Sequence, residues 1–256
     1  MLRRVLFIPF FFISISVFSQ GMNLHDFDMK KWHFGFSLSY NNSDFFYNRA
    51  PNHSFFQDSL QSLNVASKPG FTLGVVSSIN LSPNFKIRFA IPSLSFQERN
   101  LEYTYLNSPD TSEFWVKSIR PVYLDFPAMM KIRTNRINNM AVYCITGVRF
   151  GIDMASNKDV DNESASSTDQ IVKLKKTDFG IEVGGGFDFF LEYFKLGVEL
   201  KLGVGMINIH LNENTRFDQP IDYLRSKVWT FSIYPHCLVM LLLNWMCGYK
   251  HQIYLL

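Results

Sequence analysis

Large apolar side chains alternate with charged residues or glycines along two neighbouring stretches, residues 178–189 and 195–206. The apolar positions include Phe179, Ile181, Val183, Phe187, Phe189, Leu196, Val198, Leu200, Leu202, Val204 and Met206. A period of two places successive side chains on opposite faces of a β-strand. Because only the short segment 190–194 joins the two stretches, we predict that they pair as an antiparallel hairpin.

This hairpin fits two environments. In a soluble barrel or sandwich, the apolar face packs inward and the charged face meets water. In an outer-membrane barrel, the apolar face meets lipid, and small and charged side chains fill the lumen. Strands of about 9–11 residues are long enough to cross a bilayer. The hairpin by itself leaves both alternatives open.

The same alternation recurs along the chain and predicts six further strands. They cover residues 32–43, 70–81, 85 to about 105, about 115–132, 140–154 and 226 to about 234. Pro92 interrupts the third of the eight strands, and the apolar phase shifts between Phe89 and Leu94. Because proline cannot donate to a sheet ladder, we predict a bulge or bend at this point.

The predicted connections alternate in length, from long to short and back. The long ones are residues 44–69, 106–113, 155–175 and 208–225, and the short ones are residues 82–84, 133–139 and 190–194. Bacterial outer-membrane barrels combine an even number of strands with short periplasmic turns and longer external loops. We therefore predict an all-β fold, an eight-stranded antiparallel up-and-down transmembrane β-barrel. Asn162 and Glu213 should lie outside the cell, and Asn84 and Glu192 should lie in the periplasm.

The N-terminus has the pattern of an export signal. Arg3 and Arg4 precede the mostly apolar stretch 5–18, and small residues suit a cut before Gln20. This stretch is shorter than the roughly 20 residues that a spanning helix needs. We expect a signal peptide at residues 1–19, a periplasmic N-terminal segment at 20–31, the outer-membrane barrel at 32–234 and an atypical C-terminal tail at 235–256.

Composition agrees with a barrel in a membrane. Aromatic residues make up 16% of the chain, and barrels use aromatic side chains as girdles at the two membrane interfaces. The formal net charge of +3 is too small to indicate nucleic-acid binding. With only 3 cysteines, the chain has no full disulfide framework.

Several segments, in order, resemble the PorT family. They are PGFTLG at 69–74, SFQERNLEY at 95–103, YLDFP at 123–127, RINN at 136–139 and FFLEYFK at 189–195. PorT proteins are outer-membrane barrels of the type IX (Por and gliding motility) secretion system. The resemblance covers about residues 32–231 and implies a part in protein secretion, with no catalytic residues to carry over. The tail at 235–256 departs from the family, either as a natural extension or through a frame change.

Charged residues on the polar strand faces predict a lumen charge network. Its members are Lys86, Arg88, Asp125, Lys131, Arg149, Asp153, Glu182, Glu199 and Lys201. Charges in a narrow space must be paired, and an eight-stranded barrel is just wide enough for side chains to fill it. We therefore favour a packing network over a polar path for a substrate, and expect another protein to provide the secretion pore.

Candidate chemistry is weak elsewhere in the sequence. His33 shares a strand face with serines, but no spacing marks a catalytic triad. His236, Cys237, Cys247 and His251 match no zinc-binding spacing well. We expect no catalytic residue, no cofactor, no metal and no small-molecule substrate.

Aromatic residues gather in the first long connection and are candidates for external-loop contacts. They are Phe45, Phe46, Tyr47, Phe55 and Phe56. Such a cluster in a polar setting favours protein contacts. Equally, these residues could form the membrane-interface girdle or fold over the barrel mouth.

The sequence thus predicts a non-enzymatic outer-membrane barrel that type IX secretion needs for assembly or support. Its partners would be outer-membrane lipid and other secretion-system proteins, with no nucleic acid. The alternatives are a small outer-membrane barrel enzyme that acts on lipid and a soluble periplasmic barrel that binds a ligand.

Overall fold

The computed structural model describes residues 23–50, 60–108, 111–158, 160, 170–213 and 215–236. The strands are β1 (Trp32–Arg49), β2 (Leu60–Asn80), β3 (Phe85–Phe96), β4 (Arg99–Ser108), β5 (Thr111–Ile119), β6 (Val122–Arg133), β7 (Met140–Asp153), β8 (Lys173–Leu174), β9 (Thr177–Phe190), β10 (Lys195–Gly205), β11 (His210–Leu211) and β12 (Ile221–His236). A short 3₁₀ helix, η1 (His25–Met29), precedes β1. No helix among the described residues is long and apolar enough to cross a membrane.

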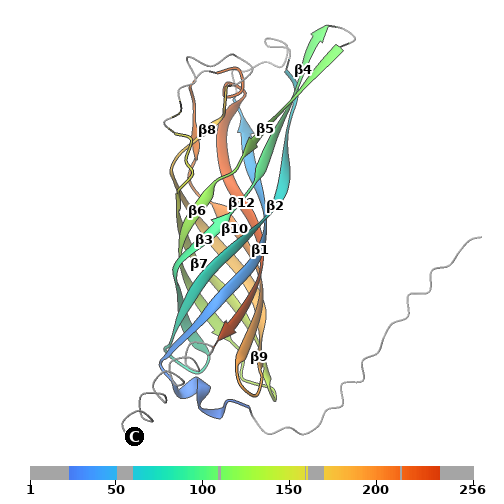
Figure 1. Cartoon of the computed structure of the whole chain (residues 1–256). Coiled ribbons are helices and arrows are strands. Elements are labelled where there is room, and N and C mark those ends of the chain that lie inside the picture. The colour runs from blue at the N-terminus through green and yellow to red at the C-terminus, as the bar shows by residue number, and fades with distance from the viewer. Residues whose placement is uncertain are drawn as a thin grey trace, which may run out of the picture.

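Eight strands close into a ring in the order β1-β12-β10-β9-β7-β6-β3-β2, and the pairing of β1 with β2 completes it. Neighbouring ring strands are antiparallel, so the chain runs up and down around a tall barrel (Figure 1). Closure gives each ring strand two partners and removes the open sheet edges. The predicted eight-stranded antiparallel barrel is confirmed.

Apolar side chains lie on the outside of the ring and polar ones on the inside. In β1, Trp32, Phe34, Phe36, Leu38 and Tyr40 are exposed, whereas His33, Ser37, Ser39 and Asn41 are buried. In the hairpin of β9 and β10, Val183 and Leu200 are 54% and 53% exposed, and Glu199 is 0% exposed. This facing is the reverse of a soluble barrel and is the arrangement of barrels that meet lipid.

The irregularity predicted at Pro92 is present in β3. The pairing of β3 with β6 shifts register between Phe89 and Ser93, and its pairing with β2 shifts opposite the same segment. Proline lacks the N–H that the ladder requires, so the strand bends and its pairing resumes in a new register.

The strands extend further than predicted at the end of the barrel that carries the long connections, here called the long-loop end. β1 runs to Arg49, β2 begins at Leu60 and β12 begins at Ile221, all within stretches that we expected to be loops. Above Ser43, β1 continues along β12, while residues 60–67 of β2 pair with β4. β4 and β5 pair with each other and form a hairpin that rises past the ring (Figure 1).

The predicted third and fourth strands are each broken in two. β3 gives way to β4 at residues 97–98, and β5 gives way to β6 at residues 120–121. The lower parts, β3 and β6, belong to the ring, whereas β4 and β5 continue only the sheet above it. On this side of the barrel, β3 and β6 therefore form the lower part and β4 and β5 form the upper part, whereas β1, β2 and β12 run through both.

A cluster of buried apolar residues closes the long-loop end, and we call it the apolar cap. Its members are Phe45, Leu60, Leu63, Leu101, Tyr103, Tyr105, Ile119, Val172, Leu174, Ile209, Phe217, Ile221 and Leu224. Backbone carbonyls satisfy its buried hydroxyls, since Tyr103 donates to Phe217 O at 2.9 Å and Tyr105 donates to Arg216 O at 3.2 Å. The cap contains side chains from β1, β2, β4, β5 and β12 and from the long connections between β7 and β9 and between β10 and β12. It therefore packs these elements against one another.

The chain before β1 folds across the opposite end, here called the short-turn end (Figure 1). We call residues 23–31 the N-terminal segment. Its Phe27 is 5% exposed and packs with Ala141 and Phe190, and the Asn23 backbone N–H donates to Asn139 Oδ1 at 2.8 Å. The predicted signal peptide and tail residues 237–256 lie outside the described residues, while β12 runs on through Pro235 to His236.

Candidate functional site

The structure places the nine predicted lumen residues inside the ring and brings eight of them into ion pairs. Lys86, Arg88, Asp125, Lys131, Arg149, Glu182, Glu199 and Lys201 each have an oppositely charged partner within 4.0 Å. Their strands alternate inward and outward, so each inward position delivers one side chain to the same narrow space. The pairs form successive groups along the barrel axis.

The group nearest the long-loop end is centred on Arg149 of β7. Arg149 Nη1 lies 3.0 Å from Asp125 Oδ1, and Arg149 Nη2 lies 2.6 Å from Asp178 Oδ2. Glu182 lies 3.8 Å from Arg149 Nε and accepts a hydrogen bond from Lys201 Nζ at 3.0 Å. One planar guanidinium thus bonds two carboxylates directly, with a third close by, which is geometry that arginine suits better than lysine.

The middle group is centred on Glu199 of β10, which is 0% exposed. Arg88 Nη1 donates to Glu199 Oε2 at 2.8 Å, Tyr143 OH donates to the same oxygen at 2.9 Å, and Tyr234 OH donates to Oε1 at 3.2 Å. A Cβ on Gly186 would lie 2.7 Å from the Tyr143 hydroxyl oxygen. The glycine in β9 therefore makes room for a tyrosine that satisfies the buried carboxylate.

The third group was only partly predicted. Asp188, which is 0% exposed, lies between Lys131 and Lys195, at 2.8 Å and 2.9 Å from their ammonium nitrogens. Lys131 also lies over the Tyr143 ring, with its nitrogen 3.3 Å from the ring centroid. One carboxylate thus serves two buried lysines, so this level of the lumen carries excess positive charge.

The lowest group lies at the short-turn end and depends on the N-terminal segment. Asp28 Oδ1 lies 3.0 Å from both Lys86 Nζ and Arg133 Nη1, and Asp28 Oδ2 lies 2.8 Å from Arg136 Nη2. Burial opposes ionisation of Asp28, but hydrogen bonds from Arg133 and the charges of Lys86 and Arg133 outweigh it and hold the pKa of this carboxyl well below its usual range. Asp28 is therefore an anion that three cations share.

Asp153 differs from the other eight predicted residues. It is buried, yet its carboxylate accepts hydrogen bonds from the backbone N–H groups of Val122 and Ala155, at 3.1 Å and 3.0 Å. No cation lies within ion-pair distance of it in the described residues. Asp153 thus fixes the turn that follows β7 and does not take part in the charge groups.

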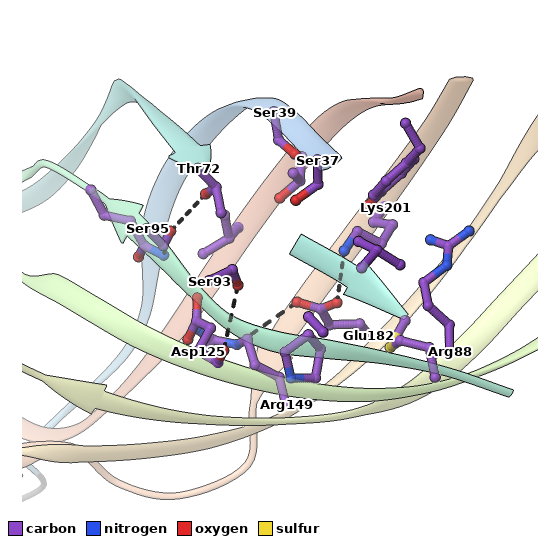
Figure 2. Close-up of a pocket in the computed structure, with 18 residues that line it drawn as sticks. Ser37, Ser39, Thr72, Arg88, Ser93, Ser95, Asp125, Arg149, Glu182 and Lys201 are labelled. Atoms are coloured by element: carbon purple, nitrogen blue, oxygen red, sulfur yellow. Dashed lines mark hydrogen bonds and ion pairs between the residues drawn. The ribbon is translucent and has the colours of Figure 1, made fainter. Parts of the chain in front are cut away.

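Between the groups centred on Arg149 and Glu199, the lumen holds a small cavity of about 50 Å³. Figure 2 shows hydroxyl groups of Ser37, Ser39, Thr72 and Ser95 along one side, with Asp125, Arg149 and Glu182 across from them. A single water molecule needs about 10–15 Å³ of such space. The cavity therefore has room for a few waters and none for a passing polypeptide.

The candidates for external-loop contacts are placed differently from the prediction. Phe45 is 4% exposed and belongs to the apolar cap, which corresponds to the alternative of folding over the barrel mouth and not to an external contact. Phe46 is 47% exposed, and Tyr47 packs against the cap and donates its hydroxyl to Leu63 O at 2.6 Å. These three residues lie on strand β1, not in a loop, while Phe55 and Phe56 lie outside the described residues.

Several buried polar residues were missed in the sequence. Asp178, Asp188 and Lys195 lie on the same predicted strand face as Glu182 and Glu199, so their period-two position was a usable signal. Arg99 had no such signal. It is 0% exposed, donates to Gln97 Oε1 and lies over the Phe45 ring at 4.5 Å, at the boundary between the lumen and the apolar cap.

In the part of the chain that the structure describes, no group of three or more His, Cys, Asp and Glu side chains has the geometry of a metal site. Three of the four tail residues that superficially resembled zinc ligands, Cys237, Cys247 and His251, lie outside that part. The fourth, His236, ends β12 and is buried.

Comparison with known families gives one match that spans most of the chain. The model of the outer membrane protein beta-barrel domain matches residues 18–211. A search of curated proteins found no match.

Solved structures of small outer-membrane barrels resemble the fold. The outer membrane protein OprG of Pseudomonas aeruginosa is 10% identical, with a TM-score of 0.44 over 80% of this chain and 92% of that chain. Neisserial surface protein A is 10% identical, with a TM-score of 0.39 over 79% and 96%. The attachment invasion locus protein Ail of Yersinia pestis is 10% identical, with a TM-score of 0.34 over 81% and 99%.

Proposed function

We propose a supporting, non-conducting role for this chain, which belongs to the outer membrane protein beta-barrel domain family. The protein is an outer-membrane β-barrel, and the exposed apolar side chains of its ring face lipid. In the outer membrane, the protein would act by supporting other proteins.

The observation that carries the proposal is that the lumen is filled along its length. Four groups of ion pairs occupy its polar part, the apolar cap closes the long-loop end, and the N-terminal segment covers the short-turn end. Moving a buried charge from its partner costs several kcal/mol, on the order of 3–5. A barrel built in this way does not open as a wide channel, so it acts through its surfaces.

We further propose that the process it supports is protein export by the type IX secretion system. The support for this step is the resemblance of five ordered segments to the PorT family, together with a lumen too full to serve as the pore. Other secretion-system proteins would then provide the conduit. The short-turn end would face the periplasm and the long-loop end the cell exterior.

Deletion of the gene tests this role. In the deletion strain, type IX cargo should accumulate in the periplasm and disappear from the medium, and wild-type protein supplied in trans should restore secretion. The lipid composition of the outer membrane should not change, because no enzymatic step on lipid is proposed. Normal cargo secretion in the deletion strain would refute the role, and a missing lipid modification would favour an enzyme.

A further inference from the structure

The N-terminal segment occupies a site that the barrel builds from three separate turns. Asn80 Nδ2, at the end of β2, donates to Lys30 O at 2.9 Å, and Arg136 Nη1, between β6 and β7, donates to Asn23 O at 3.0 Å. Asn23 Nδ2 in turn donates to Phe190 O, at the end of β9, at 3.2 Å. The segment is thus held near both of its ends by groups at the short-turn end of the barrel.

The ring does not need this segment for closure. The ladder between β1 and β2 begins at Trp32, and that between β1 and β12 begins at Gly35. Residues 23–31 contain a short 3₁₀ helix and no strand, and the Lys31 carbonyl accepts one backbone hydrogen bond, from Asn80, at 2.9 Å. The segment therefore resembles a peptide that is bound at the short-turn end and is covalently linked to β1.

Two adjacent side chains supply the specific contacts. The carboxylate of Asp28 accepts hydrogen bonds from Nη1 and Nη2 of Arg133, at 3.0 Å each, in a bidentate pair. The ring of Phe27 stacks on His33 with centroids 4.0 Å apart and meets the edge of Phe190 at 6.0 Å. The mouth of the barrel at the short-turn end thus binds an aromatic side chain and the carboxylate of the next residue.

An excess of basic side chains at this mouth explains why it binds an anion. Five basic side chains gather there, namely Lys86, Lys131, Arg133, Arg136 and Lys195, and their ion-pair partners in the described chain are Asp28 and Asp188. If Asp28 withdrew, Asp188 alone would face all five. A partly buried cation cluster without a counter-charge is unfavourable, so an empty mouth would recruit another carboxylate.

We propose that the short-turn end is a peptide-recognition site for an aromatic residue followed by a carboxylate, and that residues 23–31 of the same chain occupy it in exchange with such peptides. The barrel then presents its mouth to an acidic–aromatic segment of a periplasmic protein only when its own segment leaves. The proposal rests on the geometry of the mouth and is independent of the secretion role, because purified protein suffices to test it.

The test uses the full-length protein in detergent and a fluorescent peptide with the sequence of residues 22–31, MNLHDFDMKK. A variant with Phe27→Ala and Asp28→Asn has a weakened internal competitor. It should bind the peptide at least about tenfold more tightly than the wild-type protein, since hydrogen bonds to a charged group are worth about 1.5–3 kcal/mol. Retention of heat-modifiable gel mobility shows that the variant is folded.

Two altered peptides separate recognition from charge attraction. Asn at the position of Asp28 should weaken binding at least about tenfold, whereas Lys at the position of the exposed Met29, which changes the net charge by the same amount, should have a smaller effect. Adding Arg133→Gln to the variant should reduce the difference between the two peptides but not abolish it, because Lys86 and Arg136 remain as partners of the carboxylate. Equal binding of both peptides to the variant, or no gain in its affinity over the wild type, would overturn the proposal.

A second measurement avoids any change in the recognition contacts. Met29 is 75% exposed, so a spin label on Met29→Cys reports the motion of the N-terminal segment. Excess unlabelled peptide should increase the mobility of this label, while the peptide with Asn in place of Asp28 should leave it unchanged at the same concentration. A label that stays immobile at saturating peptide would show that the segment does not exchange.

Discussion

At the scale of single residues, Glu199 shows how the barrel holds charge in its interior. Its carboxylate is 0% exposed and bonds to Arg88, Tyr143 and Tyr234. Such a residue contributes to stability only as part of a complete set, because a buried cation without its anion is costly.

We predict that Glu199→Gln destabilises the barrel by about 3–5 kcal/mol, because Arg88 is left buried without a carboxylate. Unfolding by urea in phospholipid vesicles measures the change. Replacing both partners, with Arg88→Leu and Glu199→Leu, should cost less than the two single replacements added together. Additive effects would mean that the pair does not interact in the lipid-embedded protein.

Leu200, the next residue along β10, tests the outer face. It is 53% exposed in the isolated chain, so Leu200→Arg should cost about 2–4 kcal/mol if this position meets the bilayer midplane. Leu200→Met is the matched control and should change stability by less than about 1.5 kcal/mol. An arginine that is tolerated as well as methionine would place this face in water.

The contact of Asp28 predicts a pH response at the short-turn end. The pKa of Asp28 is lower in the folded protein than in an unfolded chain, so its contribution is complete above the unfolded value of about 3.9 and is lost as the pH falls below it. A spin label on Met29→Cys should therefore keep its mobility down to about pH 4 and become more mobile as the pH is lowered from about 4 to 2. Asp28→Asn should give a mobile label with no such transition, and an unchanged label in the wild type would contradict the assignment.

Individual inward positions could be predicted because the period of two fixes them once the outer face is known. This is why Arg88, Glu182 and Glu199 were found. Asp28 could not be found in this way. It precedes the first strand, and its partner Arg133 lies 105 residues away in the sequence, so only the closed ring brings the two together.

At the scale of elements, the alternation predicted strands well where the outer strand face meets lipid and the inner face lines the polar lumen. It failed toward the long-loop end, where the strands extend beyond the lipid-facing part of the ring. In β1, the inward positions change from polar Ser43 to apolar Phe45, while the outward Asn42 and Asp44 are polar. The facing pattern of a soluble sheet resumes there, so a search for lipid-facing strands ends too early and counts residues 44–49 as a loop.

The lengths of the connections between strands indicate how the barrel is oriented in the outer membrane. The long ones lie at one end and the short ones at the other, as the order β1-β12-β10-β9-β7-β6-β3-β2 requires. Epitope tags after Glu213 should react with antibody on intact cells, and tags at Asn84 or Glu192 should react only after the outer membrane is permeabilised. The opposite labelling pattern would invert the proposed orientation.

At the scale of the whole molecule, closure was predictable and filling was only partly so. An even strand count with alternating connections indicated a ring, and the known width of eight-stranded barrels indicated a packed lumen. The sequence analysis expected a periplasmic N-terminal segment and left open that aromatic residues fold over the mouth, but it did not predict which residues form the apolar cap or where the N-terminal segment binds, because each depends on distant parts of the chain meeting at one end of the barrel. Together they close both ends of a lumen that is already filled.

Conductance in planar lipid bilayers tests the central claim most directly. If ion pairs, the apolar cap and the N-terminal segment fill the barrel as described, the purified full-length protein should insert without producing large, stable current steps, because eight-stranded barrels leave no open interior. Loosening the N-terminal segment by Asp28→Asn should still give no wide pore, since the ion-pair groups around Glu199 and Arg149 continue to fill the lumen. Large and stable single-channel currents from the wild-type protein would contradict the filled barrel and the supporting role derived from it.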